Sequence, residues 1–302
     1  MKAWIQSPAL DKLQELDFYL LELPVTSIAL QPPPASIFRF SSTLRVATFS
    51  RCHLKDRTVQ TLLFPQLKKL ALVALVISQA SLCRIINICC PHLECLLLRT
   101  RFDVYGVRIN TPTLKCIGVR AIFVQLTIED APSLERVLFL KKMNRHMRMR
   151  VSVVSAPKLE TLGYISHDSW ESRIMFGSTC IEELRIVSLT TVVRTIKILA
   201  IDIHIDFNLD MVIDLLRCFP CLEKLYIKTK VLGYYQGIQA QVNFVTFFVL
   251  NARFLESIRL ELQMEKRVSK GARLCFTTDS HYDVSTIVDL SDLELADPFA
   301  SE

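Results

Sequence analysis

The chain has 302 residues, of which 51% are hydrophobic and 22% charged, and its formal net charge is +6. A chain this apolar must bury a core, which excludes an intrinsically disordered protein. Its longest uninterrupted apolar run, LALVALVI from Leu70, has eight residues, too few for a membrane span, so we expect no membrane partner. The first residues, MKAWIQSPALDK, contain no apolar secretory signal, and we expect an intracellular protein of the cytoplasm or nucleus.

A nine-residue phrase recurs along the chain. It contains a proline, apolar residues at positions +2, +5 and +7 from that proline, and a charged residue at +3. Six copies read FPQLKKLAL from Phe64, CPHLECLLL from Cys90, TPTLKCIGV from Thr111, APSLERVLF from Ala131, APKLETLGY from Ala156 and FPCLEKLYI from Phe219. Three copies without the proline keep most of the apolar set, at Leu44/Ala47/Phe49, Ile181/Leu184/Ile186 and Leu255/Ile258/Leu260.

The spacing of this phrase predicts the fold. The pattern L-x-x-L-x-L is the strand half of a leucine-rich repeat, and a unit of this size buries its apolar face only by stacking on its neighbours. Proline suits the corner before each strand because it cannot donate a hydrogen bond to a sheet. We therefore predict an α/β leucine-rich-repeat solenoid, a right-handed arc with parallel strands on its concave face.

The outer segments between the phrases are expected to be mixed. Ser78 or Ser81 caps a stretch that places Leu82, Ile85, Ile86 and Cys89 on one helical face. Two more helices are expected, one after Asn208 or Asp210 and one after Asn243. In the shorter units the runs VRI from Val107, FVQLTI from Phe123 and RMRVSVV from Arg148 predict extended outer segments.

No residue pattern indicates catalysis, a metal or a cofactor. Cys218 and Cys221 form a C-x-x-C, but at the end of an expected helix rather than at its start, where redox pairs lie. The cluster at Cys83–Cys95 lacks a second pair of ligands for zinc, and Asp202, His204 and Asp206 spread too far along a strand to hold one ion. We expect a protein that is not an enzyme, with an unrecognised pocket as the remote alternative.

The basic run from Lys141 to Arg150 has no interleaved aromatic residues for base stacking, so we expect no nucleic-acid partner.

Several stretches resemble plant F-box proteins of the leucine-rich-repeat and FBD type. They are FPQLKKLALVALVIS from Phe64, CPHLECLLL from Cys90, RCFPCLEKLYI from Arg217, FFVLNARFLESIRL from Phe247 and DLSDLELADPF from Asp289. The resemblance implies a repeat domain over residues 1–235 and an FBD-like region with an acidic tail over residues 236–302. It also implies a protein-binding receptor, the substrate-recognition arm of a cullin-RING ubiquitin ligase.

The chain departs from this family at the F-box, the helical unit that docks on the ligase adaptor. Leu23-Pro24 runs into VTSIALQPPPA, whose prolines are incompatible with a helix, and we recognise no F-box. Adaptor binding is therefore expected only if an F-box is supplied. Two interpretations remain beside the ligase: a truncated family member, and a scaffold or decoy that works without ubiquitin.

Positions +4, +6 and +8 should face the concave side of the sheet. They are rich in arginine and lysine, with Glu183 and Glu261 as the acidic exceptions, while the +3 row beside them is mostly acidic. We expect a protein partner with an acidic or phosphorylated segment, and the alternative is that these charges only provide solubility. The candidate partner-binding residues are Lys69, Arg99, Arg120, Arg136, Arg185, Lys224, Tyr226, Lys228 and Arg259.

Overall fold

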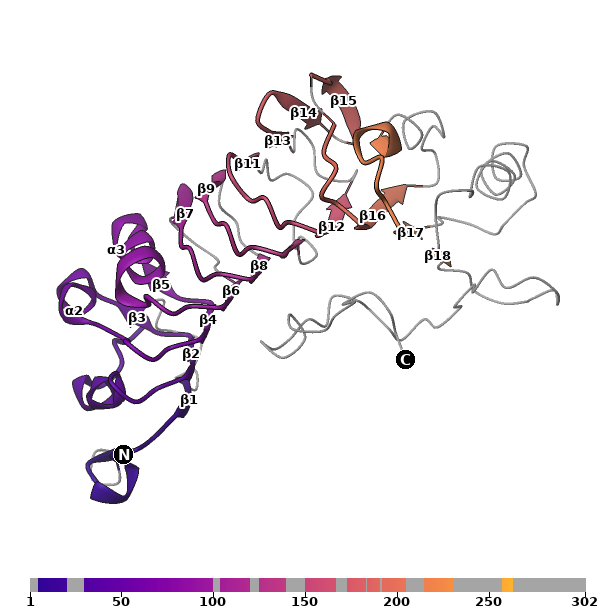
Figure 1. Cartoon of the computed structure of the whole chain (residues 1–302). Helices are drawn as coiled ribbons and strands as arrows, with labels where there is room; N and C mark the ends of the chain where they lie inside the picture. Colours follow the sequence, from indigo (N-terminus) through magenta and orange to yellow (C-terminus); the bar gives the residue numbers. More distant parts are fainter. Residues whose placement is uncertain are drawn as a thin grey trace.

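Ten parallel strands form the inner side of an arc (Figure 1). The computed structural model describes residues 5–20, 30–99, 104–119, 125–139, 150–166, 173–182, 184–190, 192–204, 215–230 and 257–262, without the side chains of 164, 166, 203, 204, 228–230 and 257–262. The strands, in sheet order, are β1 (Glu15–Tyr19), β2 (Val46–Ser50), β4 (Lys69–Val73), β6 (Cys95–Arg99), β8 (Cys116–Val119), β10 (Arg136–Phe139), β12 (Thr161–Ser166), β16 (Ile198–His204), β17 (Lys224–Lys230) and β18 (Ser257–Leu262). Sheet order follows chain order, so each repeat unit, here called a coil, stacks on the one before it.

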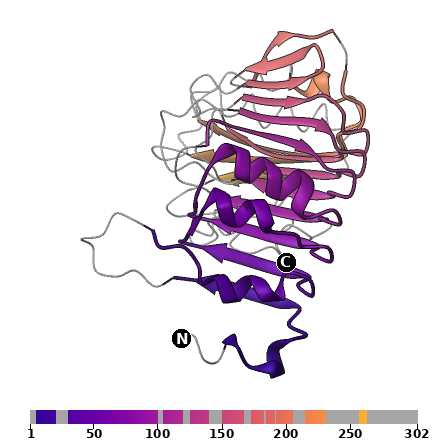
Figure 2. The same cartoon turned by 90° about the vertical axis from the view of Figure 1, so that its left-hand side faces the viewer.

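The outer side of the arc changes from helical to extended along the chain. Near the N-terminus it holds two short paired strands, β3 (His53–Leu54) and β5 (Val76–Ile77), and the helices α2 (Asp56–Thr61) and α3 (Gln79–Arg84), which Figure 2 shows from the outside. Farther along lies a six-stranded sheet of β7 (Gly106–Asn110), β9 (Gln125–Asp130), β11 (Arg150–Val153), β13 (Arg173–Phe176), β14 (Thr179–Glu182) and β15 (Arg185–Ser188). Short 3-10 helices span Pro8–Leu10 and Ala35–Phe40.

Each proline of the repeated phrase occupies the second position of a tight turn. In all six copies the amide at +2 donates to the carbonyl of the residue before the proline, as from Leu93 to Cys90 and from Leu134 to Ala131. Proline fits there because its fixed φ matches that position of a β-turn. The strand then begins at +4. Each copy of the phrase therefore forms the same turn followed by the same strand start.

Behind each turn the coils are joined by a shared hydrogen-bond acceptor. The carbonyl at +3 accepts the amides at both +3 and +4 of the next coil: the Lys68 carbonyl bonds Glu94 and Cys95 at 2.8 and 2.9 Å, and the Glu94 carbonyl bonds Lys115 and Cys116 at 2.8 and 3.1 Å. The same pair of bonds recurs at the carbonyls of Lys115, Glu135, Glu160 and Lys197. This ladder fixes the register of the sheet coil by coil.

The core lies between the two sides of the arc, where sequence reasoning placed it. Leu93, Leu96 and Leu98 of one phrase are all 0% exposed, and the corresponding residues of its neighbours are buried with them. One position differs. The phrase at Ala156 was expected to bury Tyr164, whose side chain lies outside the described part of the chain. The register between β12 and β16 shifts after Leu162, and Ile165 packs into the core opposite Ile201.

Two strands of the ten-stranded sheet contain apolar triplets that were not among the nine predicted copies of the phrase. Leu13/Leu16/Phe18 supplies β1 and Ile196/Leu199/Ile201 supplies β16. The triplet at Ile181 was predicted to form a strand of the inner sheet. It forms a hairpin of the outer sheet, in which Ile181 pairs with Ile186. Leu184 has a positive φ of 67° at this reversal. A chain that reverses within the triplet cannot run parallel to β12.

The outer segments follow the predicted mixture. Ser78 caps α3, its hydroxyl accepting the Ser81 amide at 3.1 Å, and a π-helical turn over Ile85–Cys89 continues the helix and buries Ile86 and Cys89. The three runs predicted to be extended contribute β7, β9 and β11. Of the helix expected after Asp210, Leu215–Cys218 are helical, and its start and the helix after Asn243 lie outside the described residues.

The side chains at +3 form ion pairs between neighbouring coils. Glu94 Oε1 lies 2.8 Å from Lys68 Nζ and Glu94 Oε2 lies 2.8 Å from Lys115 Nζ, and Glu160 pairs with Lys197 at 2.9 Å. Hydrogen bonds from Lys115 and Lys68 lower the pKa of Glu94 below its ordinary value. The acidic border expected along this row is thus largely neutralised by lysines of the same row.

We predict that Leu96→Asp destabilises the protein by several kcal/mol, because it places an unpaired charge at a fully buried position. Glu94→Ala, two residues away on the solvated edge, should cost no more than about 1 kcal/mol. Chemical denaturation of both variants measures the difference. Equal losses would show that Leu96 does not lie in the core.

The Glu94 ion pairs predict a specific pH dependence. A carboxyl whose pKa is lowered by folding contributes stability above its unfolded pKa, and that contribution disappears as the pH falls through the folded value. Wild type should therefore lose its stability advantage over Glu94→Gln as the pH falls below about 4.5, the ordinary pKa of a glutamate carboxyl. Denaturation curves of both proteins between neutral and acidic pH test this, and a constant difference would contradict it.

Candidate protein-interaction surface

The side of the ten-stranded sheet that faces the inside of the arc, here called the inner face, carries alternate residues of each strand. In β6, Leu96 and Leu98 enter the core, so Cys95, Leu97 and Arg99 lie on the inner face. Strand register joins such residues into rows that cross the sheet. The first row holds Val46, Lys69, Cys95, Cys116, Arg136, Thr161, Ile198 and Lys224.

From β4 to β17, the middle row of the inner face is apolar, whereas Asp17 and Thr48 continue it at one end and Arg259 at the other. It contains Ala71, Leu97, Gly118, Leu138 and Gly163, and beyond the register shift Ala200 and Tyr226. Together with Cys95 and Cys116 its larger members form a buried cluster separate from the main core, against which Val46, Val73 and Ile198 pack. Of this row, only Tyr226 was among the predicted partner-binding residues. The row as a whole corresponds to position +6 of the phrase and was not predicted from the charges.

Four of the predicted partner-binding cations flank this apolar row. Lys69, Arg136 and Lys224 each begin a strand and Arg99 ends one, and all four are half-buried. The side chain of Arg136 is only 20% exposed, and its guanidinium lies 3.4 Å from the carboxylate of Glu135. These cations are therefore packed into the face rather than extended into solvent.

The remaining predicted site residues have different outcomes. Tyr226 lies in the apolar row and is 7% exposed. Lys228 and Arg259 belong to β17 and β18, but their side chains are outside the described part, as is the whole of Arg120. The expected position of Arg185 is wrong, because Arg185 begins β15 of the outer sheet and is exposed there. It follows the hairpin at Leu184 and not the inner sheet.

The charge of the inner face is less one-sided than the expected eight basic residues against two acidic ones. Glu15 and Asp17 on β1 and Asp202 on β16 also lie on it, as the register with β2 and β17 shows. They were not counted because the triplets at Leu13 and Ile196 had not been recognised as members of the repeat, so β1 and β16 had not been placed in the inner sheet. Among the described side chains, the stretch from β4 to β10 holds Lys69, Arg99 and Arg136 and no acid, so the positive charge is concentrated in the middle of the arc.

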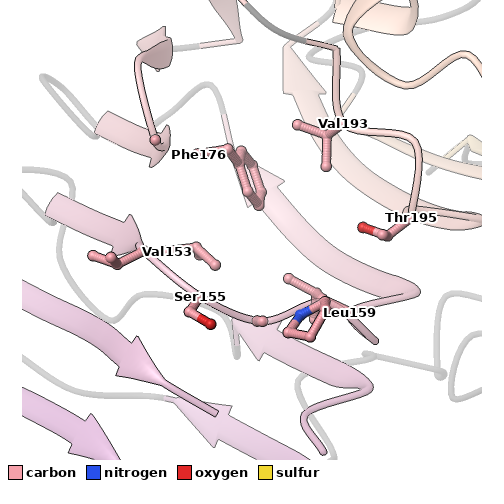
Figure 3. A pocket seen from close by; sticks show the side chains of 10 residues that line it. Val153, Ser155, Leu159, Phe176, Val193 and Thr195 are labelled. Carbon is pink, nitrogen blue, oxygen red and sulfur yellow. The ribbon is translucent and has the colours of Figure 1, made fainter. Parts of the chain in front are cut away.

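Other kinds of site find little support in the described residues. A hollow of about 340 Å³ opens beside β11 and β13, lined by residues that include Val153, Ser155, Leu159, Phe176, Val193 and Thr195 (Figure 3). Its walls contain no carboxylate, histidine, lysine or cysteine, so it offers no acid–base catalyst.

Within the described part of the chain, no three metal-ligating side chains gather into a site, and the cysteines found there are free thiols. None of the helices in that part has the length and hydropathy needed to cross a bilayer.

Comparison with known proteins identifies the family. The model of the family described as "FBD-associated F-box protein At5g56370, LRR repeats" matches residues 1–227, which contain eight of the ten inner strands and the first part of β17. No curated protein and no solved structure matches the chain. The match covers most of the chain and agrees with the α/β repeat architecture and its parallel sheet. The chain therefore belongs to the leucine-rich-repeat family of plant FBD-associated F-box proteins.

Proposed function

We propose that the protein is a receptor that binds another protein on its inner face, as the substrate-recognition arm of an F-box-type, cullin-RING ubiquitin ligase. The observation that carries this proposal is the apolar middle row flanked by half-buried cations. Membership of an F-box-associated repeat family supports a protein-interaction role and connects it with ubiquitin ligases.

The dimensions of the inner face suit an extended peptide. Neighbouring strands lie about 4.8 Å apart, so the ten strands span on the order of 45 Å. A segment that crosses the strands can place apolar side chains against Leu97, Leu138 and Tyr226. On either side of this row it meets Lys69, Arg99 and Arg136.

The cations favour a partner with an acidic or phosphorylated segment. Arginine binds carboxylate and phosphate through two parallel hydrogen bonds, and such bonds are stronger where water is excluded. Solubility alone would call for fully exposed charges, yet Lys69, Arg99, Arg136 and Lys224 are half-buried. Their packing supports recognition over a purely solvating role.

The domain organisation that we propose has two parts. Residues 1–235 form a right-handed leucine-rich-repeat solenoid, and residues 236–302 form an FBD-like region that completes it and ends in an acidic tail. This organisation is supported by β18, which lies in the second part and extends the sheet of the first by one strand through its parallel pairing with β17.

The alternative is a scaffold or decoy that holds its partner without ubiquitin transfer. It is favoured by the Leu23-Pro24 phrase, which the prolines that follow it keep from opening an F-box helix. Recovery of the ligase adaptor and cullin together with the partner would support the receptor. Recovery of the partner without them would support the decoy.

We predict that Arg99→Glu combined with Arg136→Glu lowers capture of the partner from plant extract at least about tenfold, because like charges then face its acidic segment. The matched control is Arg150→Glu with Arg185→Glu, which makes the same charge change on exposed residues of the outer sheet. Quantitative mass spectrometry of the captured proteins measures both. Equal capture by the two variants would place the binding site elsewhere.

A second prediction concerns the adaptor. The 302-residue chain should not bind the purified ligase adaptor, whereas the same chain with an F-box fused before Met1 should bind it at the F-box's own affinity. Calorimetry with the two purified proteins tests this. Tight binding by the unfused chain would show that another part of it docks on the adaptor.

A further inference from the structure

The hollow beside β11 and β13 lies where the stacking of regular coils is interrupted. In regular coils the amide of the residue before the proline bonds the next coil, as Thr111 bonds the Asp130 carbonyl at 3.1 Å and Ala131 bonds the Ser155 carbonyl at 3.0 Å. The following coil inserts the hairpin of β14 and β15 before the chain reaches Val193. The hollow opens at this place, between residues 153–159 on one side and residues 193–195 on the other.

The walls of the hollow are apolar and formed by the folded chain itself. All ten lining residues belong to the described part, and Val153, Phe176 and Val193 line it from three separate segments (Figure 3). The ring of Phe176 packs edge-on against that of Phe219, with 6.2 Å between the ring centroids. The volume of about 340 Å³ is at the lower end of ligand pockets, which run from roughly 300 to 1,000 Å³. The hollow is therefore preformed and suits one large apolar group.

Exposed apolar side chains gather around the hollow. Val154 lines it and is 66% exposed, so the hollow is open to solvent. Leu189 is 45% exposed and precedes Thr190, whose hydroxyl donates to Ser178 Oγ beside the hollow at 2.6 Å. Val192, 38% exposed, directly precedes a lining residue. Single exposed apolar residues are common on folded proteins, but a group of them around a hollow is typical of a docking site.

Two cations stand at the rim of the hollow. Lys158 and Arg194 each lie between two lining residues in the sequence, and both are exposed. Within the described part of the chain, neither forms an ion pair, whereas Lys197 nearby pairs with Glu160 at 2.9 Å. One acid adjoins the hollow, Asp130, whose carboxylate accepts the hydroxyl of a lining serine at 3.2 Å. Among the described residues, the rim outside the paired Glu160 and Lys197 thus holds two cations and one acid.

We propose that this hollow is a second protein-docking site, which receives one large apolar side chain from a partner segment that has acidic residues beside it. The apolar side chain enters the hollow, and the acids pair with Lys158 and Arg194. Because apolar surface continues from the hollow onto Val154, Leu189 and Val192, the occupant extends beyond it, as expected for a protein segment rather than for a small molecule enclosed in a pocket.

The site is independent of the proposed function. It adjoins the outer sheet and shares no residue with the apolar row and the cations of the inner face. A protein docked at the hollow leaves the inner face free for another, so the chain can hold two proteins at once.

The probe for this site is the acetylated, amidated tripeptide Glu-Phe-Glu. It is titrated into the isotope-labelled full chain, and the methyl signals of valine and leucine are followed by NMR. Signals of Val154, Val192 and Val193 should shift with a dissociation constant on the order of 1 mM, while those of Leu96 and Leu98 in the core stay in place. The tripeptides Lys-Phe-Lys and Glu-Ala-Glu are the controls for charge and for the apolar side chain. Each should bind at least about fivefold more weakly.

Charge reversal at the rim supplies the test variant. Lys158→Glu with Arg194→Glu should weaken Glu-Phe-Glu at least about fivefold and make Lys-Phe-Lys the tighter of the two, because the sign of the rim is exchanged. The matched control is Lys55→Glu with Arg57→Glu, which makes the same charge change on exposed residues at the start of α2 and should leave binding unchanged. Unchanged core methyl signals report that each variant is folded. The comparison of the three peptides on wild type requires no variant.

Several results would overturn the proposal. No shift of the three valines up to about 10 mM Glu-Phe-Glu would mean that the hollow takes no such side chain. Equal binding of Lys-Phe-Lys or of Glu-Ala-Glu would exclude the acidic or the apolar part of the partner. Equal binding of N-acetylphenylalaninamide would indicate a small-molecule site, and shifts that depend on protein concentration without peptide would identify a second copy of the chain as the occupant.

The same measurement separates this site from the inner face. Arg99→Glu combined with Arg136→Glu should leave the peptide-induced shift of Val154 unchanged, and loss of that shift would also contradict the proposal. Partner capture on the inner face does not enter the titration, so failure here is distinct from failure of the proposed function.

Discussion

The shared carbonyl at +3 is the constraint on which the rest of the structure depends. Each of these oxygens accepts two amides of the next coil, as the Glu135 carbonyl accepts those of Glu160 and Thr161. A strand held at its first residue has no freedom to slip, and a slip by one residue would exchange its core and inner-face side chains. The proline turn places this anchor, and the apolar triplet then enters the core without further adjustment.

Because the hydrogen bonds at +3 fix the first residue of each strand, the side chains of the inner face line up in rows. Because every strand starts from the same anchor, residues at +4, +6 and +8 line up across the arc with their counterparts in other coils. Among the described pairings of the ten-stranded sheet, the register shift after Leu162 shows what the anchor does not control. Beyond Gly163 the strand resumes pairing at Ile165, which packs into the core opposite Ile201.

Sequence reasoning succeeded where local chemistry and packing agree. The burial of Leu93, Leu96 and Leu98 could be predicted because the proline, the charged residue and the apolar spacing coincide in one phrase. Without the proline, sequence reasoning was unreliable: the triplets at Leu44 and Leu255 lie at β2 and β18 of the inner sheet as predicted, but the triplet at Ile181 does not. Ile181/Leu184/Ile186 and Ile196/Leu199/Ile201 have the same spacing, yet the first forms a hairpin and the second enters the sheet. The difference depends on the reversal at Leu184, which no spacing rule detects.

The candidate surface was harder to predict than the core because its character depends on which strands are neighbours. Positions +4, +6 and +8 of the phrase predicted a basic strip, but Glu15, Asp17 and Asp202 join this face only once β1 and β16 are placed in the inner sheet. The apolar row likewise depends on adjacency, since register places Leu97 beside Ala71 and Gly118, and Leu97 belongs to a buried cluster on this face. A surface with an apolar centre and charged margins binds segments that match both features. Charge alone, which any acidic chain supplies, satisfies the margins and leaves the centre in contact with water. Selectivity on this face therefore depends on where the apolar residues of a bound segment fall relative to its carboxylates.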